Sequence, residues 1–570
     1  MDLLDRFRAA VARHPDREAV VAPDGTTVTF DELHTRVRRL SGALVAAGVA
    51  PGDRVGVCLA RGPGLLTALL GVWSAGGAYV PLDPAYPRAR LDLMAADAGL
   101  AVVIADDPWP NGIRTVRPSP AGDVRTGRPE VVVPPGAPAY LIYTSGSTGA
   151  PKGVSVSRAA VAHLVDALTA AGAYPAEPAR VAWNASVSFD ASVQQWVRVC
   201  RGDTVLTLTE ELRGDPAALA DFLVAARATD LDCTPSHWSV LRERVGAAAE
   251  RLPGGLRLFV GGEAIPAEMW RDLAGDGAIR ALNLYGPTEA AVDSTVAVVD
   301  GAEPHLGPPL PGVGAYVLDD RLRPAGEGEL YLAGPGLAHG YHGRAGLTAA
   351  RFLPDPAGPP GARMYRTGDR VRWRADGSLT YLGRVDHQVK VNGFRVELGE
   401  IEATLAAHPA VAAAVVALRE HPARGRSLAA YWVPAAGAPA DPAPLRAHLR
   451  EQLPEHLAAL PLTPLDALPL GVGGKVDRDR LPDPVESADG DLPAGDLEVS
   501  IARAWEQVLG RERVLATDDF FALGGHSLVA LRVVADLKKR HGVVIRTRTV
   551  YEYPRLRDLA SFVARSQRAG

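Results

Sequence analysis

The chain has 570 residues, of which 47% are hydrophobic and 22% charged, and this composition is typical of a folded protein with several domains. Its formal net charge of -5 gives no electrostatic reason to expect nucleic acid, and its N-terminus, charged from the second residue, predicts no signal peptide. The three cysteines are far apart, without metal-ligand spacing and too few for a disulfide framework, so we expect a cytoplasmic protein with a small-molecule or protein partner and no membrane.

Strand-like and helical runs alternate through most of the first 380 residues. In chain order the first of these runs are RVGVCLA, GLLTALLGVWSAG, GAYVPL, RARLDLMAADAG and AVVIAD. The alternation predicts an α/β fold with helices packed on largely parallel sheets. Residues 62–82 carry no charge and approach membrane-spanning length, but Gly71, Gly76 and Pro81 interrupt a regular helix. We therefore expect a buried helix, a turn and a strand there.

The pattern changes near residue 383. Residues 388–418 read as strands, a helix and another strand, residues 482–494 have the composition of a linker, and three amphipathic helical patterns follow. The predicted organisation is a large multi-layer N-terminal subdomain (1–383), a small α/β C-terminal subdomain (384–481), a linker (482–494) and an all-α helical bundle (495–570).

The stretch LIYTSGSTGAPKG (141–153) joins a strand-like run to a loop of small and hydroxylated residues. Gly146 and Gly149 permit backbone N–H groups of the loop to converge on phosphate oxygens, and Lys152 adds a positive charge. The P-loop pattern G-x-x-x-x-G-K-[ST] is absent, because Pro151 stands where its second glycine belongs. Taken alone, such a loop is a plain turn about half of the time.

Further motifs accompany this loop in a definite order. They are GAYVPLDPAYP before it and, after it, FDAS, NLYGPTEA, GELYLAGPGLAHGY, YRTGD, GRVDHQVKVNGFRVELGEIE and GGKVDR. This ordered set closely resembles the core motifs of the adenylation domains of nonribosomal peptide synthetases, within the adenylate-forming ligase superfamily, over residues 10–482. The resemblance implies that an amino acid is activated by ATP as its aminoacyl adenylate.

The resemblance also implies residue roles in a site for ATP and Mg²⁺. These are Thr144, Ser145, Gly146, Ser147, Thr148, Gly149, Lys152 and Thr288 at the phosphates, Glu289 at Mg²⁺, Tyr285 beside adenine, Asp369 and Arg384 at the ribose, and Lys475 between the substrate carboxylate and the adenylate. Backbone donors, a cation and a metal suit the charge that develops on the phosphoryl oxygens. Considered singly, each charged residue would be a loop cap or a surface charge in roughly nine cases of ten, and the ordered set reverses those odds.

Aligned motif by motif, the family's pocket-lining positions predict the amino-acid site. They fall on Asp190, Ala191, Gln194, Asp232, Phe259, Gly261, Leu284, Val292 and Asp293. Asp190 resembles the residue that pairs with the α-ammonium, and Gly261 leaves room for a long side chain. A terminal carboxamide can donate to Asp232 and accept from Gln194, and this residue set looks like that of glutamine-activating domains. Ornithine or lysine is the alternative, and glutamate fits worse because no cation is expected beside it.

The sequence departs from the family's motifs at two places, and one further residue matches the family's hinge. Val472, Gly473 and Gly474 stand where the family usually has Pro-Asn-Gly, which adds backbone freedom before the catalytic lysine, and His339 replaces a common arginine. Asp386 matches the family's hinge, about which the small subdomain swings after adenylation. The resemblance therefore implies a mobile C-terminal subdomain.

The C-terminal bundle resembles a peptidyl carrier (thiolation) domain. The run LGGHSL matches the family's attachment motif, so Ser527 is the expected site of 4′-phosphopantetheine at the start of a helix, where the helix dipole favours a phosphodiester. A lone serine there would be an N-cap in roughly four cases of five. A hydrolase elbow is not supported, since GGHSL lacks the second glycine of G-x-S-x-G.

The expected partners follow from this organisation. They are an amino acid, a phosphopantetheinyl transferase and a downstream condensation or tailoring enzyme. The downstream enzyme is expected in trans, because no condensation motif and no terminal thioesterase is recognised. The need for an MbtH-like helper protein is left open. A free acyl-CoA synthetase is a competing function, but Asp190 and the carrier domain argue against it. A non-catalytic adaptor is a third, opposed by Glu289, Asp369 and Lys475.

Overall fold

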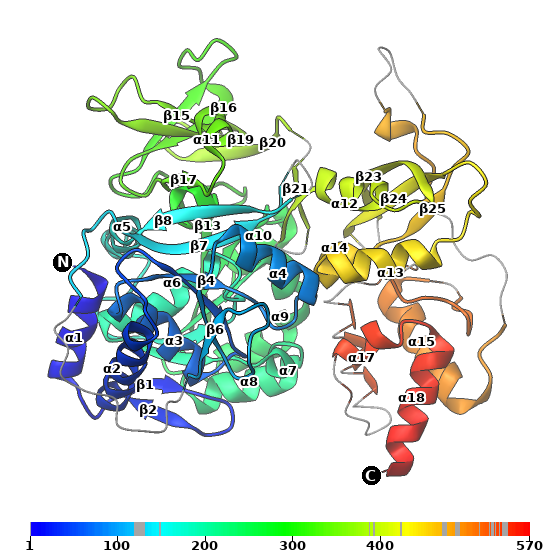
Figure 1. Ribbon diagram of the computed structural model, residues 1–570, viewed down its shortest axis with the longest axis horizontal. Coiled ribbons are helices and arrows are strands. Elements are labelled where there is room, and N and C mark those ends of the chain that lie inside the picture. The colour runs from blue at the N-terminus through cyan, green and yellow to red at the C-terminus, as the bar shows by residue number, and fades with distance from the viewer. Residues whose placement is uncertain are drawn as a thin grey trace.

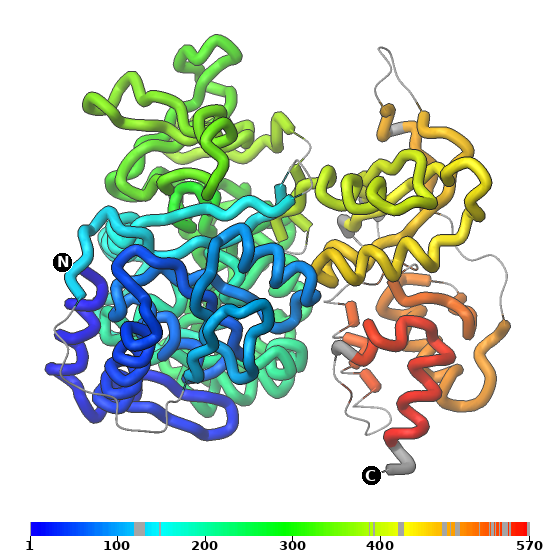
Figure 2. Tube along the Cα trace, in the orientation of Figure 1, coloured from blue at the N-terminus to red at the C-terminus, as the bar shows by residue number. Residues whose placement is uncertain are grey.

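The computed structural model describes residues 2–118, 131–146, 150–386, 388–391, 394–421, 425–469, 476–484, 491–511, 513–521, 523, 525, 529–530, 532–534, 536–537, 545 and 547–569. They form a large N-terminal part, a smaller mixed part and a helical C-terminal part (Figure 1). Figure 2 shows the yellow trace of the mixed part above the orange and red trace of the helical part. Within these ranges no helix combines the length and the apolar character needed to cross a bilayer.

Two large sheets form the N-terminal part. The first has the order β14-β13-β12-β11-β9-β10-β1-β2, and the second has the order β17-β8-β7-β4-β3-β5-β6. The first comprises β1 (Glu18–Val21), β2 (Thr27–Thr29), β9 (Arg180–Trp183), β10 (Thr204–Thr207), β11 (Asp230–Cys233), β12 (Leu256–Gly261), β13 (Ile279–Tyr285) and β14 (Thr295–Val298). The second comprises β3 (Arg54–Cys58), β4 (Ala78–Pro81), β5 (Val102–Ala105), β6 (Arg114–Val116), β7 (Pro138–Thr144), β8 (Lys152–Ser157) and β17 (Gly340–Tyr341). The inner pairings are parallel and the antiparallel ones lie toward the edges, so the prediction of largely parallel sheets is confirmed.

Helices lie between the two sheets and on their outer faces. The core between the sheets contains residues of α1 (Leu3–Arg13), α2 (Phe30–Ala46), α3 (Pro63–Ser74), α5 (Arg158–Ala170) and α6 (Ala191–Trp196). The outer face of the first sheet carries α8 (Pro216–Ala225), α9 (Pro235–Ala249) and α10 (Ala267–Ala274), and the second sheet carries α4 (Arg88–Asp97). The short helices α7 (Glu210–Arg213) and α11 (Ala345–Arg351) bury no residue. The uncharged stretch at 62–82 is α3 followed by β4, as expected.

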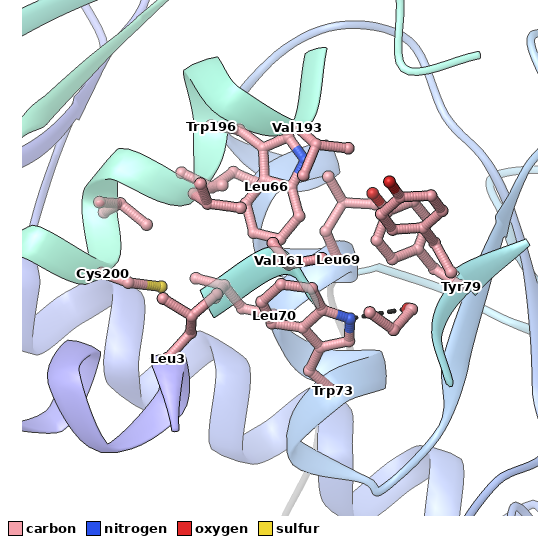
Figure 3. Packing of buried hydrophobic residues seen from close by; sticks show 14 of the residues in the cluster. Leu3, Leu66, Leu69, Leu70, Trp73, Tyr79, Val161, Val193, Trp196 and Cys200 are labelled. Carbon is pink, nitrogen blue, oxygen red and sulfur yellow. Dashed lines mark hydrogen bonds between the residues drawn. The ribbon is translucent and has the colours of Figure 1, made fainter. Parts of the chain in front are cut away.

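Two tryptophans in the shared core fix the position of α6. Trp73 of α3 and Trp196 of α6 pack with ring centroids 4.9 Å apart, and both are almost fully buried (Figure 3). The Trp73 indole N–H donates to the Ala139 carbonyl of β7 at 2.8 Å. Because α6 begins directly after Asp190, this packing also positions the first residues of the predicted amino-acid pocket.

A third sheet in the N-terminal part is antiparallel and was not predicted as a separate unit. It contains β15 (Gly314–Leu318), β16 (Glu327–Ala333), β18 (Phe352–Pro354), β19 (Arg363–Trp373) and β20 (Leu379–Arg384). The connection between β15 and β16 is too short for a crossover helix and is closed by Asp319, whose carboxylate accepts the N–H groups of Arg321 and Arg323. Asp369 of the long strand β19 accepts a hydrogen bond from Tyr285 of β13, so this sheet meets the first one there.

The small subdomain has the predicted order of elements. The hairpin of β21 (Gln388–Val391) and β22 (Phe394–Glu397) precedes α12 (Leu398–Ala406), β23 (Val411–His421), β24 (Gly425–Pro434), α13 (Ala443–Gln452), α14 (Glu455–Ala458) and β25 (Leu462–Pro464). Strands β23, β24 and β25 form one sheet, and α12 and α13 pack on it. This confirms the strand, helix and strand predicted for residues 388–418.

The C-terminal part is helical where it is described. It contains α15 (Gly495–Leu509), α17 (Thr547–Glu552) and α18 (Leu556–Ala569) around a core that includes Trp505 and Phe520. The bundle contacts the small subdomain, since Arg446 of α13 donates to Asp519 at 3.3 Å and Ala459 packs against the bundle core. The first and third predicted helical patterns are confirmed as α15 and α18, and part of the second lies outside the described residues.

Candidate active site

A cleft opens between the large N-terminal part and the β21–β22 hairpin. Its lining includes Thr144, Ser145, Asp190, Thr288, Asp369 and Arg384 from the large part and the β19–β20 region, and Gln388, Lys390, Arg395 and His456 from the small subdomain. Residues that are far apart in the sequence and were predicted to bind ATP and the amino acid therefore lie around one cavity.

Three of the predicted nucleotide residues contact one another. Asp369 of β19 is buried and accepts a hydrogen bond on Oδ1 from Arg384 Nη1 at 2.6 Å and on Oδ2 from the Tyr285 hydroxyl at 2.6 Å. Asp369 and Arg384 are paired neighbours on β19 and β20. Burial and the adjacent Asp369 carboxylate raise the pKa of Tyr285 well above its usual value, so its phenol stays a hydrogen-bond donor. An aromatic ring and a carboxylate side by side suit a nucleoside.

Glu289 lies in a 3-10 turn (Thr288–Ala290) and is completely buried. Its Oε1 accepts from the Tyr341 hydroxyl and its Oε2 from Arg395 Nη1, each at 2.7 Å. Burial opposes ionisation, but Arg395 and Lys152 outweigh it and hold the pKa of Glu289 at about 2, so this carboxylate is charged. Within the described residues no three His, Cys, Asp or Glu side chains form a metal cluster, and a lone carboxylate suits Mg²⁺ that is otherwise held by phosphates and water.

The predicted phosphate loop is described up to Gly146 and again from residue 150, so Ser147, Thr148 and Gly149 lie outside the described residues. A Cβ atom at Gly146 would collide with the Ala150 carbonyl oxygen, which explains the glycine there. Lys152 is buried, donates to Glu397 at 3.1 Å and lies 5.4 Å from the centre of the Tyr341 ring. Burial lowers the pKa of Lys152.

The predicted amino-acid pocket lies at the ends of neighbouring parallel strands. Asp232 of β11 is paired with Phe259 of β12, and Gly261 of β12 is paired with Leu284 of β13. Gln194 of α6 donates its Nε2 to Asp232 Oδ2 at 2.7 Å. A Cβ atom at Gly261 would lie 2.8 Å from the Leu284 carbonyl oxygen, so close strand packing requires the glycine in addition to the room it leaves.

Asp190 and Ala191 stand at the start of α6, and Asp190 also lines the large cleft. Asp190 caps α6, because its carboxylate accepts the Ala191 N–H at 3.0 Å. Burial raises the pKa of Asp190, while Thr288 and Lys390 act in the opposite direction. A substrate ammonium next to this carboxylate would relieve the cost of its burial.

The last two predicted pocket residues, Val292 and Asp293, lie in or directly after an unusual turn. Ala291 and Val292 both have positive φ values, 53° and 77°, which is rare for residues other than glycine and is found where a site is held in a strained conformation. Asp293 follows this turn and is buried near Asp232 and Asp190, and burial, followed by these two carboxyl groups, raises its pKa well above the usual range. No sequence pattern signalled these conformations.

Two residues behind the pocket were missed by the sequence reasoning. The Tyr174 hydroxyl donates to the Gln194 carbonyl oxygen at 3.2 Å, and Arg198 lies 4.3 Å from the Tyr174 ring. Arg198 lines the small cavity shared with Gln194 and Asp232. It is paired with buried Asp203 and Asp230, but its Nη2 has no partner among the described residues. A cation therefore does lie near the end of the pocket.

The remaining predicted positions are of two kinds. Asp386 is described and accepts from Arg384 Nε at 2.7 Å and Nη2 at 2.9 Å, while His339 forms backbone hydrogen bonds beside β8. Lys475 and the preceding Val472, Gly473 and Gly474 lie outside the described residues, as does Ser527. Lys390, Arg395 and Glu397 belong to a quoted motif but were not singled out individually.

Comparison with protein-family models identifies the chain. Residues 7–342 match the AMP-binding enzyme family, residues 400–475 match the C-terminal domain of that family, and residues 500–563 match the phosphopantetheine attachment site family. The chain belongs to the AMP-binding enzyme family. This AMP-binding enzyme uses ATP with Mg²⁺, and its phosphopantetheine attachment domain carries 4′-phosphopantetheine.

Similar proteins are nonribosomal peptide synthetases. The AMP-binding enzyme is 43% identical over 96% of its length to a probable non-canonical nonribosomal peptide synthetase of Salinispora arenicola, CymA, of which it covers 7%. It is 37% identical over its whole length to the dimodular nonribosomal peptide synthase of Bacillus subtilis, of which it covers 24%. The chain thus spans a small fraction of these relatives. It joins an AMP-binding enzyme domain to a phosphopantetheine attachment domain.

Solved structures of the same organisation also match. Holo-PA1221, an NRPS protein with adenylation and PCP domains bound to a vinylsulfonamide inhibitor, superposes with a TM-score of 0.80 at 26% identity, over 99% of this AMP-binding enzyme and 97% of that chain. Holo-AB3403, a four-domain nonribosomal peptide synthetase bound to AMP and glycine, has a TM-score of 0.61 at 32% identity, over 99% of this chain and 43% of that one. The predicted fold class of an α/β adenylation domain with a helical carrier domain is confirmed.

Proposed function

We propose that this enzyme joins L-glutamine to the α-phosphate of ATP as glutaminyl adenylate, with release of pyrophosphate, and then transfers the glutaminyl group to the thiol of phosphopantetheine on Ser527 of its own carrier domain, with release of AMP. The prosthetic group supplies the nucleophilic thiol. The aminoacyl group is then used in trans, by a condensation or tailoring enzyme of natural-product biosynthesis. An MbtH-like helper protein is a further candidate partner.

The pairing of Gln194 with Asp232 carries the substrate proposal. Gln194 Nε2 donates one hydrogen to Asp232 Oδ2, which leaves Asp232 Oδ1 and the second Nε2 hydrogen for a ligand. A carboxamide satisfies both, because its NH₂ donates to Asp232 and its carbonyl accepts from Gln194. An apolar side chain of the same size would leave these buried groups unpaired, which discriminates strongly against it.

Glutamate is the second candidate, and one observation favours it. Arg198 lines the same small cavity as Gln194 and Asp232. Its Nη2 has no hydrogen-bond partner among the described residues. However, Arg198 already pairs with Asp203 and Asp230, so its charge is neutralised before a substrate arrives. The side-chain carboxylate of glutamate would face Asp232 and Asp293, whose pKa values burial already raises, so a third acidic group would be harder still to keep ionised there. Ornithine or lysine would pair with those carboxylates but would gain little from Gln194.

The proposed roles in adenylation follow the same residues. Asp190 pairs with the α-ammonium, Tyr285 and Asp369 hold the nucleoside, and Thr288 with the loop that contains Lys152 holds the phosphates. Glu289 is the proposed ligand of Mg²⁺, and Lys475 stabilises the charge between carboxylate and α-phosphate. Asp386 is the proposed hinge.

An exchange assay tests the substrate. Amino-acid-dependent exchange of labelled pyrophosphate into ATP is measured for the full chain with each proteinogenic amino acid and with ornithine. We expect the highest kcat/KM with glutamine. Highest activity with glutamate, ornithine or an apolar amino acid would refute the substrate, and no exchange with any of them would refute adenylation of these amino acids.

A further inference from the structure

Tyr174 lies behind the amino-acid pocket, in the short segment that follows α5. Its side chain is buried, and it lines the small cavity that Gln194 and Asp232 also line. The Tyr174 ring packs edge-on against the pocket residue Phe259, with ring centroids 6.0 Å apart and an interplanar angle of 79°. Tyr174 therefore contacts two residues of the predicted pocket without belonging to any of the motifs.

Two arginines hold the Tyr174 ring in place. Arg198 and Arg201 belong to the 3-10 turn after α6 (Val197–Arg201), and their guanidinium carbons lie 4.3 Å and 5.1 Å from the centre of the ring. Both arginines pair with the buried Asp203, at 2.7 Å and 3.3 Å. The position of the Tyr174 hydroxyl is therefore fixed by a buried ion-pair network behind the pocket.

The Tyr174 hydroxyl meets both oxygens of Gln194. It donates to the main-chain carbonyl oxygen at 3.2 Å and to the side-chain Oε1 at 3.4 Å. Burial raises the pKa of Tyr174 well above its usual value, so the hydroxyl keeps its hydrogen. With Oε1 turned toward Tyr174, the Nε2 of Gln194 is turned toward Asp232, to which it donates at 2.7 Å.

The direction of this amide decides what the end of the pocket offers to a substrate. In the observed direction Gln194 presents an N–H beside an oxygen of Asp232, which is one donor and one acceptor and matches a carboxamide. In the reversed direction it would present its oxygen beside Asp232, and two acceptors match the ammonium group of ornithine or lysine. The two directions have nearly the same shape, so packing alone does not choose between them.

We propose that Tyr174 is a specificity-determining positioning residue, whose hydroxyl holds the Gln194 amide in the direction that selects a carboxamide over an ammonium side chain. A reversed amide would bring an N–H toward the hydroxyl hydrogen. Tyr174 acts through Gln194 and not on the reacting atoms. The inference rests on the glutamine pocket given under the proposed function.

Tyr174→Phe tests this role, because it removes the hydroxyl and keeps the ring that contacts Phe259 and the two arginines. Pyrophosphate exchange of the full chain gives kcat/KM for glutamine and for ornithine. The ratio of glutamine to ornithine should fall about three- to tenfold, the effect of one hydrogen bond. A purely structural role would lower both values alike and leave the ratio unchanged.

Tyr316→Phe is the matched control. The Tyr316 hydroxyl donates to Asp355 at 3.2 Å in the antiparallel third sheet, away from the pocket residues. The variant therefore loses one hydroxyl and one hydrogen bond, as Tyr174→Phe does. Its ratio of glutamine to ornithine should equal that of the unmodified chain.

A double-mutant cycle shows whether Tyr174 acts through the amide. Gln194→Met keeps the length of the side chain and removes the amide, so no group is left for the hydroxyl to orient. In this background Tyr174→Phe should change the ratio no further. A change as large as in the unmodified background would show that Tyr174 acts by another route, such as its contact with Phe259, and would overturn the inference.

A measurement on the unmodified chain does not depend on the folding of any variant. In 5-oxonorleucine a methyl group replaces the NH₂ of glutamine, so its side chain only accepts, and norleucine has the same length without the oxygen. Because the Gln194 N–H faces the pocket, exchange with 5-oxonorleucine should exceed exchange with norleucine about tenfold. Equal values would show that the pocket presents no donor, and the direction assigned to the amide would be wrong.

The same assays separate the two possible failures. If the unmodified chain prefers glutamine and Tyr174→Phe leaves the ratio of glutamine to ornithine unchanged, the role of Tyr174 is refuted and the proposed substrate stands. If the unmodified chain prefers ornithine, the proposed substrate fails, and the direction assigned to the Gln194 amide fails with it.

Discussion

Asp232→Asn is the most informative change in the amino-acid pocket. Asp232 accepts from Gln194 Nε2 at 2.7 Å and keeps one oxygen for the substrate. In the variant the introduced amide accepts from Gln194 with its oxygen and turns its NH₂ toward the substrate, where it meets the NH₂ of glutamine. Burial raises the pKa of Asp232 to about 8, so the carboxylate is charged in an assay above that pH. Loss of a hydrogen bond to a charged acceptor corresponds to about 1.5–3 kcal/mol, so kcat/KM for glutamine should fall about ten- to hundredfold there.

Pyrophosphate exchange with glutamine and with glutamate measures this effect. Glutamate should lose less than glutamine, because the change also removes a like charge. The exposed Asp221 of α8 provides the control, since Asp221→Asn lies far from the pocket and should change neither value. A glutamine-to-glutamate ratio that is the same in Asp232→Asn and in the unmodified enzyme would refute the assignment of Asp232.

The remaining predictions concern pH, the carrier, catalysis and the hinge. Burial raises the pKa of Asp232 to about 8, so below that pH the protonated acid can donate to glutamate, and above it the anion repels glutamate. The ratio of glutamate to glutamine activity should therefore rise as pH falls through 8, and this rise should be smaller in Asp232→Asn, where Asp293, whose pKa is also raised, is the remaining acid of the pair. Ser527→Ala should abolish the mass gain on incubation with coenzyme A and a phosphopantetheinyl transferase, and a gain that persists would place the arm elsewhere. Lys475→Ala should lower pyrophosphate exchange by roughly a hundredfold or more with an unchanged melting temperature, and near-normal exchange would contradict its role. Asp386→Pro should leave the protein folded but impair loading of the carrier more than Asp386→Ala does. Both variants remove the carboxylate, and proline also restricts the backbone. Equal loading by the two variants would argue against a hinge at this position.

The amino-acid sequence was sufficient to predict the family and the α/β character of the first two subdomains, and it identified individual strands and helices of both. Strands such as β3, β4 and β5 are short apolar runs bounded by turns, and α3 is uncharged throughout, so local composition specified them. Motif residues such as Asp369 and Glu289 were recognisable because each lies within a short characteristic segment.

The partners of those residues were decided by the tertiary structure. Arg395 reaches Glu289 across 106 positions of sequence, and this contact depends on how two subdomains pack. Arg198 lies near the pocket because α6 and the turn after it are held against the core by Trp196, so the expectation that no cation lies near was wrong. The left-handed turn at Ala291 and Val292 is likewise imposed by packing against local preference. The conformational preferences of single residues and the spacing of motifs carry no information on such contacts. The free energy of these contacts arises only when segments that are distant in the sequence pack together and exclude water.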